Sequence, residues 1–369
     1  MTTIFDYLRW RGDLSFSQSP LNPVDALIFS VLAYLPFDGL VDSGSKRAGA
    51  DLSEIAREFQ RREVPKDKIR SVMDLELLRV CGLSRRFGQT VPFAYVNRTD
   101  LAEEKQFSAI SFRFGKKSVF AAFRGTDLSL VGWKEDFNMS FMCPVPAQTE
   151  ALSYLERIAS SFRGPLYVGG HSKGGNLAVY SSAFAHPRIQ KRIHSVYNND
   201  GPGFDASVLS SPGFKRLENR LFAFVPESSI IGMLLEHQEE YTIVSSSVSG
   251  ILQHDPYSWA VEGPDFVRVD TVDDSSRFID RTIRDWLAAV DPEKRELFID
   301  SLWEIVTVTN AHTLRDFASD WLKHTRTMIR TFKNVDPETR SMLVDTAGLL
   351  FKTATRNLVA KEPERKKRS

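Results

Sequence analysis

The sequence contains few cysteines, almost no net charge and no long apolar run, and each of these absences excludes a class of protein. Cys81 and Cys143 are too few and too far apart for a disulfide framework or a zinc cluster. The net charge of +1 gives no reason to expect nucleic acid as a partner. No uncharged run is long enough to span a bilayer, and charges interrupt any signal-peptide core near the N-terminus. We therefore expect a cytoplasmic protein with no transmembrane segment.

Residues 166–180 carry the strongest local pattern. A short apolar run ends in glycines, and Gly170-His171-Ser172-Lys173-Gly174 then fits the nucleophile-elbow pattern G-x-S-x-G before a helical run begins. Such a pattern predicts a strand, a sharp turn and a helix, with Ser172 projecting from the strand end. The backbone N–H of Lys173 and the positive end of the helix dipole then face any negative charge that forms beside Ser172. An ordinary glycine-rich turn is the alternative.

The order of elements around this stretch predicts the fold class. Polar and apolar side chains alternate over residues 107–114, and a turn and a buried strand at 118–123 complete a hairpin. The pattern then predicts helices at 149–162 and 206–218, and strands at 165–169, 193–197, 221–225 and 241–245. Alternating strands and helices after an antiparallel start predict an α/β-hydrolase-like mixed, mainly parallel sheet with helices on both faces.

The remaining regions favour helix. We predict an N-terminal helical layer over residues 1–100, an α/β-hydrolase core over 101–270, a C-terminal helical region over 271–360 and a charged tail over 361–369. The apolar stripe of the C-terminal helices is typical of core packing. A homodimer face or a transient contact with a membrane surface are the alternatives.

A nucleophilic serine needs a histidine base and an orienting carboxylate, which in this fold follow in the order Ser, Asp or Glu, His. His254 lies in a loop after the strand at 241–245 and fits that order best. Two strand ends offer the acid, Asp200 and Glu227, and we rank Asp200 first because its shorter side chain follows its strand directly. Asp200 as a turn former and Glu227 as a helix cap are the structural alternatives.

The segment Phe123-Arg124-Gly125-Thr126, followed by Trp133 and Asp136, resembles the oxyanion loop F-R-G-S/T with a later W-x-x-D of the class 3, fungal-type lipases. Their elbow reads G-H-S-x-G-G, as at residues 170–175. The resemblance implies that Thr126 joins the Lys173 N–H in an oxyanion hole. In those lipases the acid follows the later strand, at the place of Glu227 and Ser228, so the resemblance leaves the choice of acid open. Over its full length the chain looks most like the Mbeg-like bacterial family, which implies a lipase-like fold.

These observations favour a serine hydrolase that cleaves a small-molecule or lipid carboxylic ester through an acyl-enzyme on Ser172, with no metal and no cofactor. Transfer to a thioester or a non-water acceptor is an alternative within the same chemistry. A non-catalytic binding or scaffolding module on a lipase-like fold is the second hypothesis. The apolar residues expected to form an acyl pocket or a lid, unless they are simply core, are Ile230, Ile231, Met233 and Leu234.

Overall fold

The computed structural model of the chain divides into two compact units. It describes residues 1–44, 49–62, 64–65, 68–100, 105–126, 135, 138–139, 142–229, 232, 241–271, 278, 281–282, 285–286, 289–291, 293–294, 297–298, 300–301, 330–332, 335 and 337–365. The first unit comprises residues 1–99, 107–127 and 146–272, and the second comprises 100–106, 128–145 and 273–369. The four-part division made from the sequence stays a prediction.

The N-terminal part of the first unit is helical as far as residue 88. Its helices are α1 (Ile4–Arg11), α2 (Pro23–Leu32), α3 (Leu52–Arg61), α4 (Val72–Leu83) and α5 (Arg85–Gly88). Side-chain caps fix several starts: the side chains of Asn22, Asp51 and Ser71 accept backbone N–H groups at the beginnings of α2, α3 and α4. The prediction of a purely helical region to residue 100 is wrong over its last ten residues, because Val91–Asp100 forms a strand.

A seven-stranded sheet forms the centre of the fold. Its strands, in their order across the sheet, are β1 (Val91–Asp100), β2 (Lys105–Phe114), β3 (Ser118–Phe123), β4 (Leu166–His171), β5 (Ile193–Asn199), β6 (Leu221–Pro226) and β7 (Tyr241–Val244). The hairpin of β2 and β3 is antiparallel, whereas β3 to β7 are parallel. The predicted mixed, mainly parallel sheet is confirmed.

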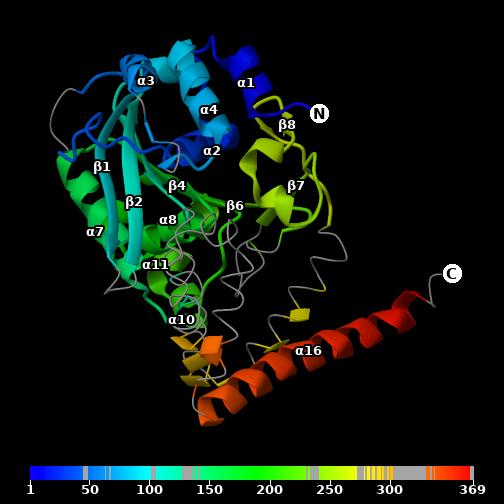
Figure 1. The fold of residues 1–369 in the computed structure, drawn as a ribbon. Helices are drawn as coiled ribbons and strands as arrows, with labels where there is room; N and C mark the ends of the chain where they lie inside the picture. The colour runs from blue at the N-terminus through cyan, green and yellow to red at the C-terminus, as the bar shows by residue number, and fades with distance from the viewer. Residues whose placement is uncertain are drawn as a thin grey trace. The chain divides into compact units, whose positions relative to one another are not determined.

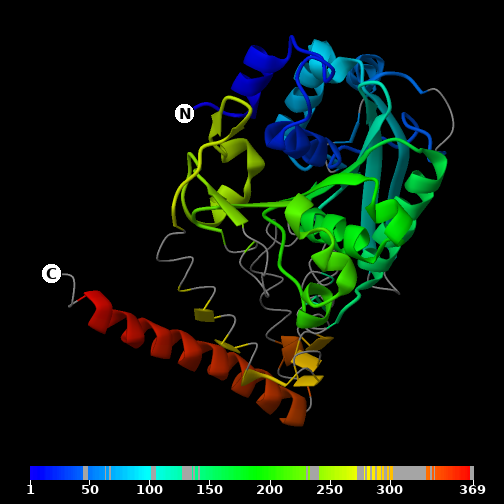
Figure 2. The same cartoon turned by 180° about the vertical axis from the view of Figure 1, so that it is seen from behind.

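The sheet is covered by helices on both faces, as predicted for an α/β-hydrolase (Figures 1 and 2). Alternate residues of the strands enter two separate cores: Phe120 and Ala122 of β3 pack with α1 to α4, whereas Val119, Ala121 and Phe123 pack with helices of the other face. Because successive side chains of a strand enter different cores, the strands are buried on both faces of the sheet. The carboxyl ends of β3 to β6 lie in register at one edge of the sheet.

The second face is covered mainly by two long helices, α7 (Pro146–Ser161) and α8 (Lys173–Phe184), with short helices between later strands. The shorter elements are α9 (Pro187–Gln190), α10 (Ala206–Leu209), α11 (Pro212–Lys215) and η2 (Glu218–Arg220). The single helix predicted over 206–218 is therefore wrong. Ser211 and Pro212 start a new helix there, with the Ser211 hydroxyl accepting the Phe214 N–H. After β7 come η4 (Gly250–His254), η5 (Pro256–Ser258), β8 (Val261–Glu262) and β9 (Asp265–Phe266).

In the second unit, the described residues include the long helix α16 (Pro337–Arg365), seen at the C-terminal end of the ribbon in Figure 1. The Trp286 indole N–H donates to the Thr346 carbonyl over 3.0 Å, and Arg356 pairs with Asp285. Within the described parts of the chain, no helix is both long and apolar enough to cross a membrane. The predicted homodimer and membrane-surface faces stay predictions.

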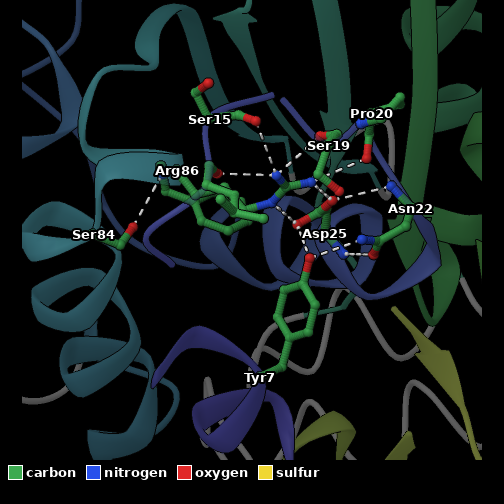
Figure 3. A network of polar contacts seen from close by, with 10 residues as sticks. Tyr7, Ser15, Ser19, Pro20, Asn22, Asp25, Ser84 and Arg86 are labelled. Atoms are coloured by element: carbon green, nitrogen blue, oxygen red, sulfur yellow. Dashed lines mark hydrogen bonds and ion pairs between the residues drawn. The ribbon is translucent and has the colours of Figure 1, made fainter. Parts of the chain in front are cut away.

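A buried ion pair joins the N-terminal helices (Figure 3). The Arg86 guanidinium donates from Nε to Asp25 Oδ1 over 2.7 Å, and both side chains are fully buried. Tyr7 donates its hydroxyl to the same carboxylate over 2.8 Å. Nη2 donates to Asp25 Oδ2 over 2.5 Å. Nη1 and Nη2 also bind four main-chain carbonyls of the segment between α1 and α2, those of Leu14, Ser15, Ser19 and Pro20. Every donor and acceptor of the pair therefore has a partner, which is the condition for burying charges without a large penalty.

Replacing Arg86 by Met should destabilise the protein by about 3–5 kcal/mol, because Asp25 would remain as a buried charge without its cation. The midpoint of urea unfolding measures the loss. Arg9→Met removes an exposed ion pair with Asp6 and should cost less than about 1 kcal/mol. Equal effects of the two substitutions would contradict the assigned role of Arg86.

Candidate active site

Ser172 lies in a strained turn between β4 and α8. Its backbone φ is 59° and its ψ is −136°, a conformation that a residue with a Cβ rarely adopts. Although it stands at the N-cap of α8, its side chain makes no capping hydrogen bond, so the hydroxyl is not used to satisfy its own helix. The turn is tight: a Cβ on Gly170 would lie 2.1 Å from the carbonyl carbon of Gly174. This geometry is that of a nucleophile elbow.

The loop after β3 packs directly against the elbow. A Cβ on Gly125 would lie 3.0 Å from the Cβ of Ser172 and 2.6 Å from the His171 carbonyl oxygen, so only glycine fits. Thr126 follows Gly125 in the chain, and Lys173 is the first residue of α8. The two residues expected to supply the oxyanion hole therefore come from the two segments that meet at Ser172. Trp133 and Asp136 lie outside the described residues.

Asp200 and His254 are brought together from positions 54 residues apart. The distance between His254 Nδ1 and Asp200 Oδ2 is 2.6 Å. Because a carboxylate only accepts, Nδ1 carries the proton of this hydrogen bond, and in the neutral ring Nε2 is then the acceptor. The Asp200 side chain is fully buried, whereas 27% of the His254 side chain is exposed. Asp200 also has a positive φ of 54°, and its N–H donates to the Phe224 carbonyl over 2.8 Å.

Ser229 holds the other oxygen of the same carboxylate, a contact that the sequence did not reveal. Its hydroxyl donates to Asp200 Oδ1 over 2.5 Å and accepts the Gly232 N–H over 2.9 Å. Ser229 follows β6, next to the place where the resemblance to class 3 lipases puts their acid. The Ser229 hydroxyl thus lies near that place. The carboxylate that it binds, Asp200, follows the neighbouring strand β5.

Glu227, the alternative acid, contacts strand β7 through its main chain. It is half-buried, and its backbone N–H donates to the Val244 carbonyl over 3.1 Å. The nearby main chain is instead tied to the His254 loop, because the Ser228 N–H donates to the Gln253 side chain over 2.7 Å. The expected pocket or lid residues Ile230, Ile231, Met233 and Leu234 lie outside the described residues.

His171, the residue before the serine, contacts the main chain of His254. The His171 side chain is buried, and its Nε2 lies 2.8 Å from the His254 carbonyl oxygen. Its Nδ1 lies 3.0 Å from the hydroxyl of Tyr34, a residue that follows α2. Burial, together with the neighbouring His254 and Arg70, holds the pKa of His171 well below its usual value of 6.5. His171 is therefore a neutral imidazole at neutral pH.

Comparison with profiles of known families places the chain in one of them. The profile of the Mbeg1-like family matches residues 81–304, which is more than half of the chain. The chain belongs to the Mbeg1-like family. Comparison with curated protein sequences finds no match. Tyr34 and the residues of α1 to α3 lie outside the range that the Mbeg1-like profile matches.

Solved lipases are among the structures similar to this Mbeg1-like chain. The M37 lipase shares 13% identity at a TM-score of 0.37, covering 57% of this chain and 69% of its own. MDLA from Penicillium cyclopium shares 11% identity at a TM-score of 0.36, with 66% and 83% covered. The lipase from Rhizopus microsporus var. chinensis shares 14% identity at a TM-score of 0.32, with 65% and 79% covered.

Metal ligands are not clustered in the part of the chain that the structure describes. No group of three or more His, Cys, Asp or Glu side chains is arranged there to hold a metal ion. Cys81 is buried and Cys143 is exposed, and the two do not form a disulfide.

The neutral state of His171 predicts a pH dependence of stability. In the unfolded chain the imidazole binds a proton below about pH 6.5, whereas the folded protein does not, so stability falls as the pH drops from 6.5 towards 5. The slope from this residue alone reaches about 1.4 kcal/mol per pH unit. Urea unfolding at several pH values measures it, and His171→Gln should flatten the slope in that window. An unchanged slope in the variant would contradict the neutral assignment.

Proposed function

We propose that this Mbeg1-like protein is a serine hydrolase that cleaves a carboxylic ester through an acyl-enzyme on Ser172. The observation that carries the proposal is the pairing of His254 Nδ1 with the buried Asp200 carboxylate, in a fold that also holds Ser172 in a strained elbow. The proposed nucleophile, acid and base follow one another in the chain order expected for this fold. Glu227 has no part in the proposed triad.

In the proposed mechanism, His254 Nε2 takes the proton of Ser172 as the serine oxygen attacks the ester carbonyl. Asp200 holds the imidazole in the required tautomer and stabilises the imidazolium that forms. The backbone N–H groups of Thr126 and Lys173 stabilise the oxyanion, aided by the N-terminus of α8. His254 then returns the proton to the leaving alcohol, and water releases the acid from Ser172 by the reverse sequence.

A fluorophosphonate should label the purified protein at one serine, because a hydroxyl that shares its proton with a histidine is unusually nucleophilic. Labelling and hydrolysis of short-chain aryl esters should vanish in Ser172→Ala and fall strongly in His254→Ala. Ser181→Ala, in the same helix α8, is the matched control and should label like the parent. Mass spectrometry of the labelled peptide identifies the residue.

A folded parent that neither labels nor hydrolyses esters or thioesters of any chain length, with detergent present, would overturn the enzyme proposal. That outcome would favour the binding module, since a fold alone does not guarantee a function.

The choice of acid is tested by two carboxylate-to-amide substitutions. Asp200→Asn should lower kcat by about ten-thousand-fold, because the amide holds the imidazole in the wrong tautomer. Glu227→Gln should leave most of the activity, and steady-state kinetics on an aryl ester measures both. A larger loss in Glu227→Gln would reverse the assignment.

A further inference from the structure

The carbonyl of His254 is held by a histidine that the proposed mechanism does not use. His171 Nε2 lies 2.8 Å from this carbonyl oxygen, and the two imidazole rings pack with centroids 4.7 Å apart. A carbonyl only accepts, so Nε2 carries the proton of the neutral ring. Nδ1 is then an acceptor, and the Tyr34 hydroxyl lies 3.0 Å away to donate to it. The Tyr34 hydroxyl also lies 3.3 Å from the His171 main-chain carbonyl oxygen. The His254 carbonyl therefore specifies the tautomer of the neutral His171 ring, and Tyr34 contacts its other nitrogen.

Tyr34 is itself held by residues of the N-terminal helices. The guanidinium of Arg70 lies 4.0 Å from the centroid of the Tyr34 ring. Arg70 also makes two hydrogen bonds to Asp74 of α4, over 3.1 and 2.6 Å. These residues are largely buried, so the hydroxyl of Tyr34 has little freedom to turn away from His171.

The same N-terminal helices hold the loop that carries His254 at a second point. The Tyr257 hydroxyl donates to Asp74 Oδ1 over 2.7 Å, and its ring stacks on Phe5 of α1 with centroids 5.6 Å apart. Further along the chain, the Val261 N–H donates to the Thr2 carbonyl over 2.9 Å. The base is therefore carried by a loop whose main chain is bound both by the elbow and by residues 1–80.

We infer that His171 is a positioning residue for His254, and that Tyr34 holds the ring of His171 in place, so that the N-terminal helices form part of the active site. The inference rests on the proposed function, because it assigns these residues to the same reaction. His171 binds the main-chain carbonyl of His254 and so fixes the backbone that carries the imidazole paired with Asp200.

The kinetic test compares Tyr34→Phe with Tyr154→Phe. Both changes remove one buried tyrosine hydroxyl, and Tyr154 pairs with Ser111 in the core on the other face of the sheet. Tyr34→Phe should lower kcat on an aryl ester about tenfold and leave KM unchanged, because it loosens an orienting hydrogen bond without touching substrate. Tyr154→Phe should keep the kcat of the parent. His171→Leu should lose more than Tyr34→Phe, and His171→Gln, which keeps an N–H donor, should recover part of it.

Nitrogen NMR of labelled histidine tests the contacts independently of any activity. In the parent, His171 should show the tautomer with the proton on Nε2 from pH 8 to pH 5.5. The proton on His254 Nδ1, in its 2.6 Å bond to Asp200, should give a strongly downfield signal. Tyr34→Phe should broaden or shift that signal, whereas Tyr154→Phe should not.

The inference is overturned if His171 shows the other tautomer or becomes protonated near pH 6.5. It is also overturned if Tyr34→Phe matches Tyr154→Phe in both kcat and spectrum. Should the parent fail to label with a fluorophosphonate, the proposed function fails, but the spectra still decide whether Tyr34 and His171 hold His254. If His171→Leu does not fold, the tyrosine pair and the spectra of the parent remain decisive.

Discussion

The turn at Ser172 is the constraint on which the rest of the site depends. A residue with a Cβ is held there at a positive φ, which costs free energy unless the surroundings leave no alternative. The Ser172 N–H donates to the Asn199 carbonyl over 2.9 Å, and the glycines around the turn allow backbone to approach backbone. Three neighbouring parallel strands, β3 to β5, therefore meet at this point, and the residues that follow them lie close to the serine.

The buried carboxylate of Asp200 meets a second physical requirement, which is that a buried charge must be hydrogen-bonded. A charge with no exposure to water needs a hydrogen bond on each oxygen, and Asp200 has Ser229 on one and His254 on the other. Two adjacent strand ends supply this arrangement, with Asp200 after β5 and Ser229 after β6. The resemblance to class 3 lipases pointed to the second of these ends for the acid. Ser229 and Asp200 join these two strand ends through one hydrogen bond between their side chains.

The N-terminal helices contribute both stability and position. Arg86 and Asp25 hold α2 and the segment before it, while Tyr34, just after α2, contacts the histidine of the elbow. Because these contacts are buried, a change that loosens the helices also changes the surroundings of His254. The profile of the Mbeg1-like family begins at residue 81, so these contacts come from a part of the chain that the profile does not match.

Local patterns in the sequence were sufficient for the elbow, the hairpin of β2 and β3 and the mainly parallel sheet. Glycine spacing and two-residue alternation report backbone requirements that neighbouring residues impose on one another. The same patterns missed β1 and merged α10 and α11 into one helix. A strand forms through pairing with a partner, and a helix also ends where a later cap begins. The sequence by itself named Ser172, His254 and two possible acids. Only the tertiary structure decided which carboxylate lies against His254, and it alone brought Ser229, His171 and Tyr34 to the site. The reason is that hydrogen bonds between residues far apart in the chain produce no periodic pattern in the sequence.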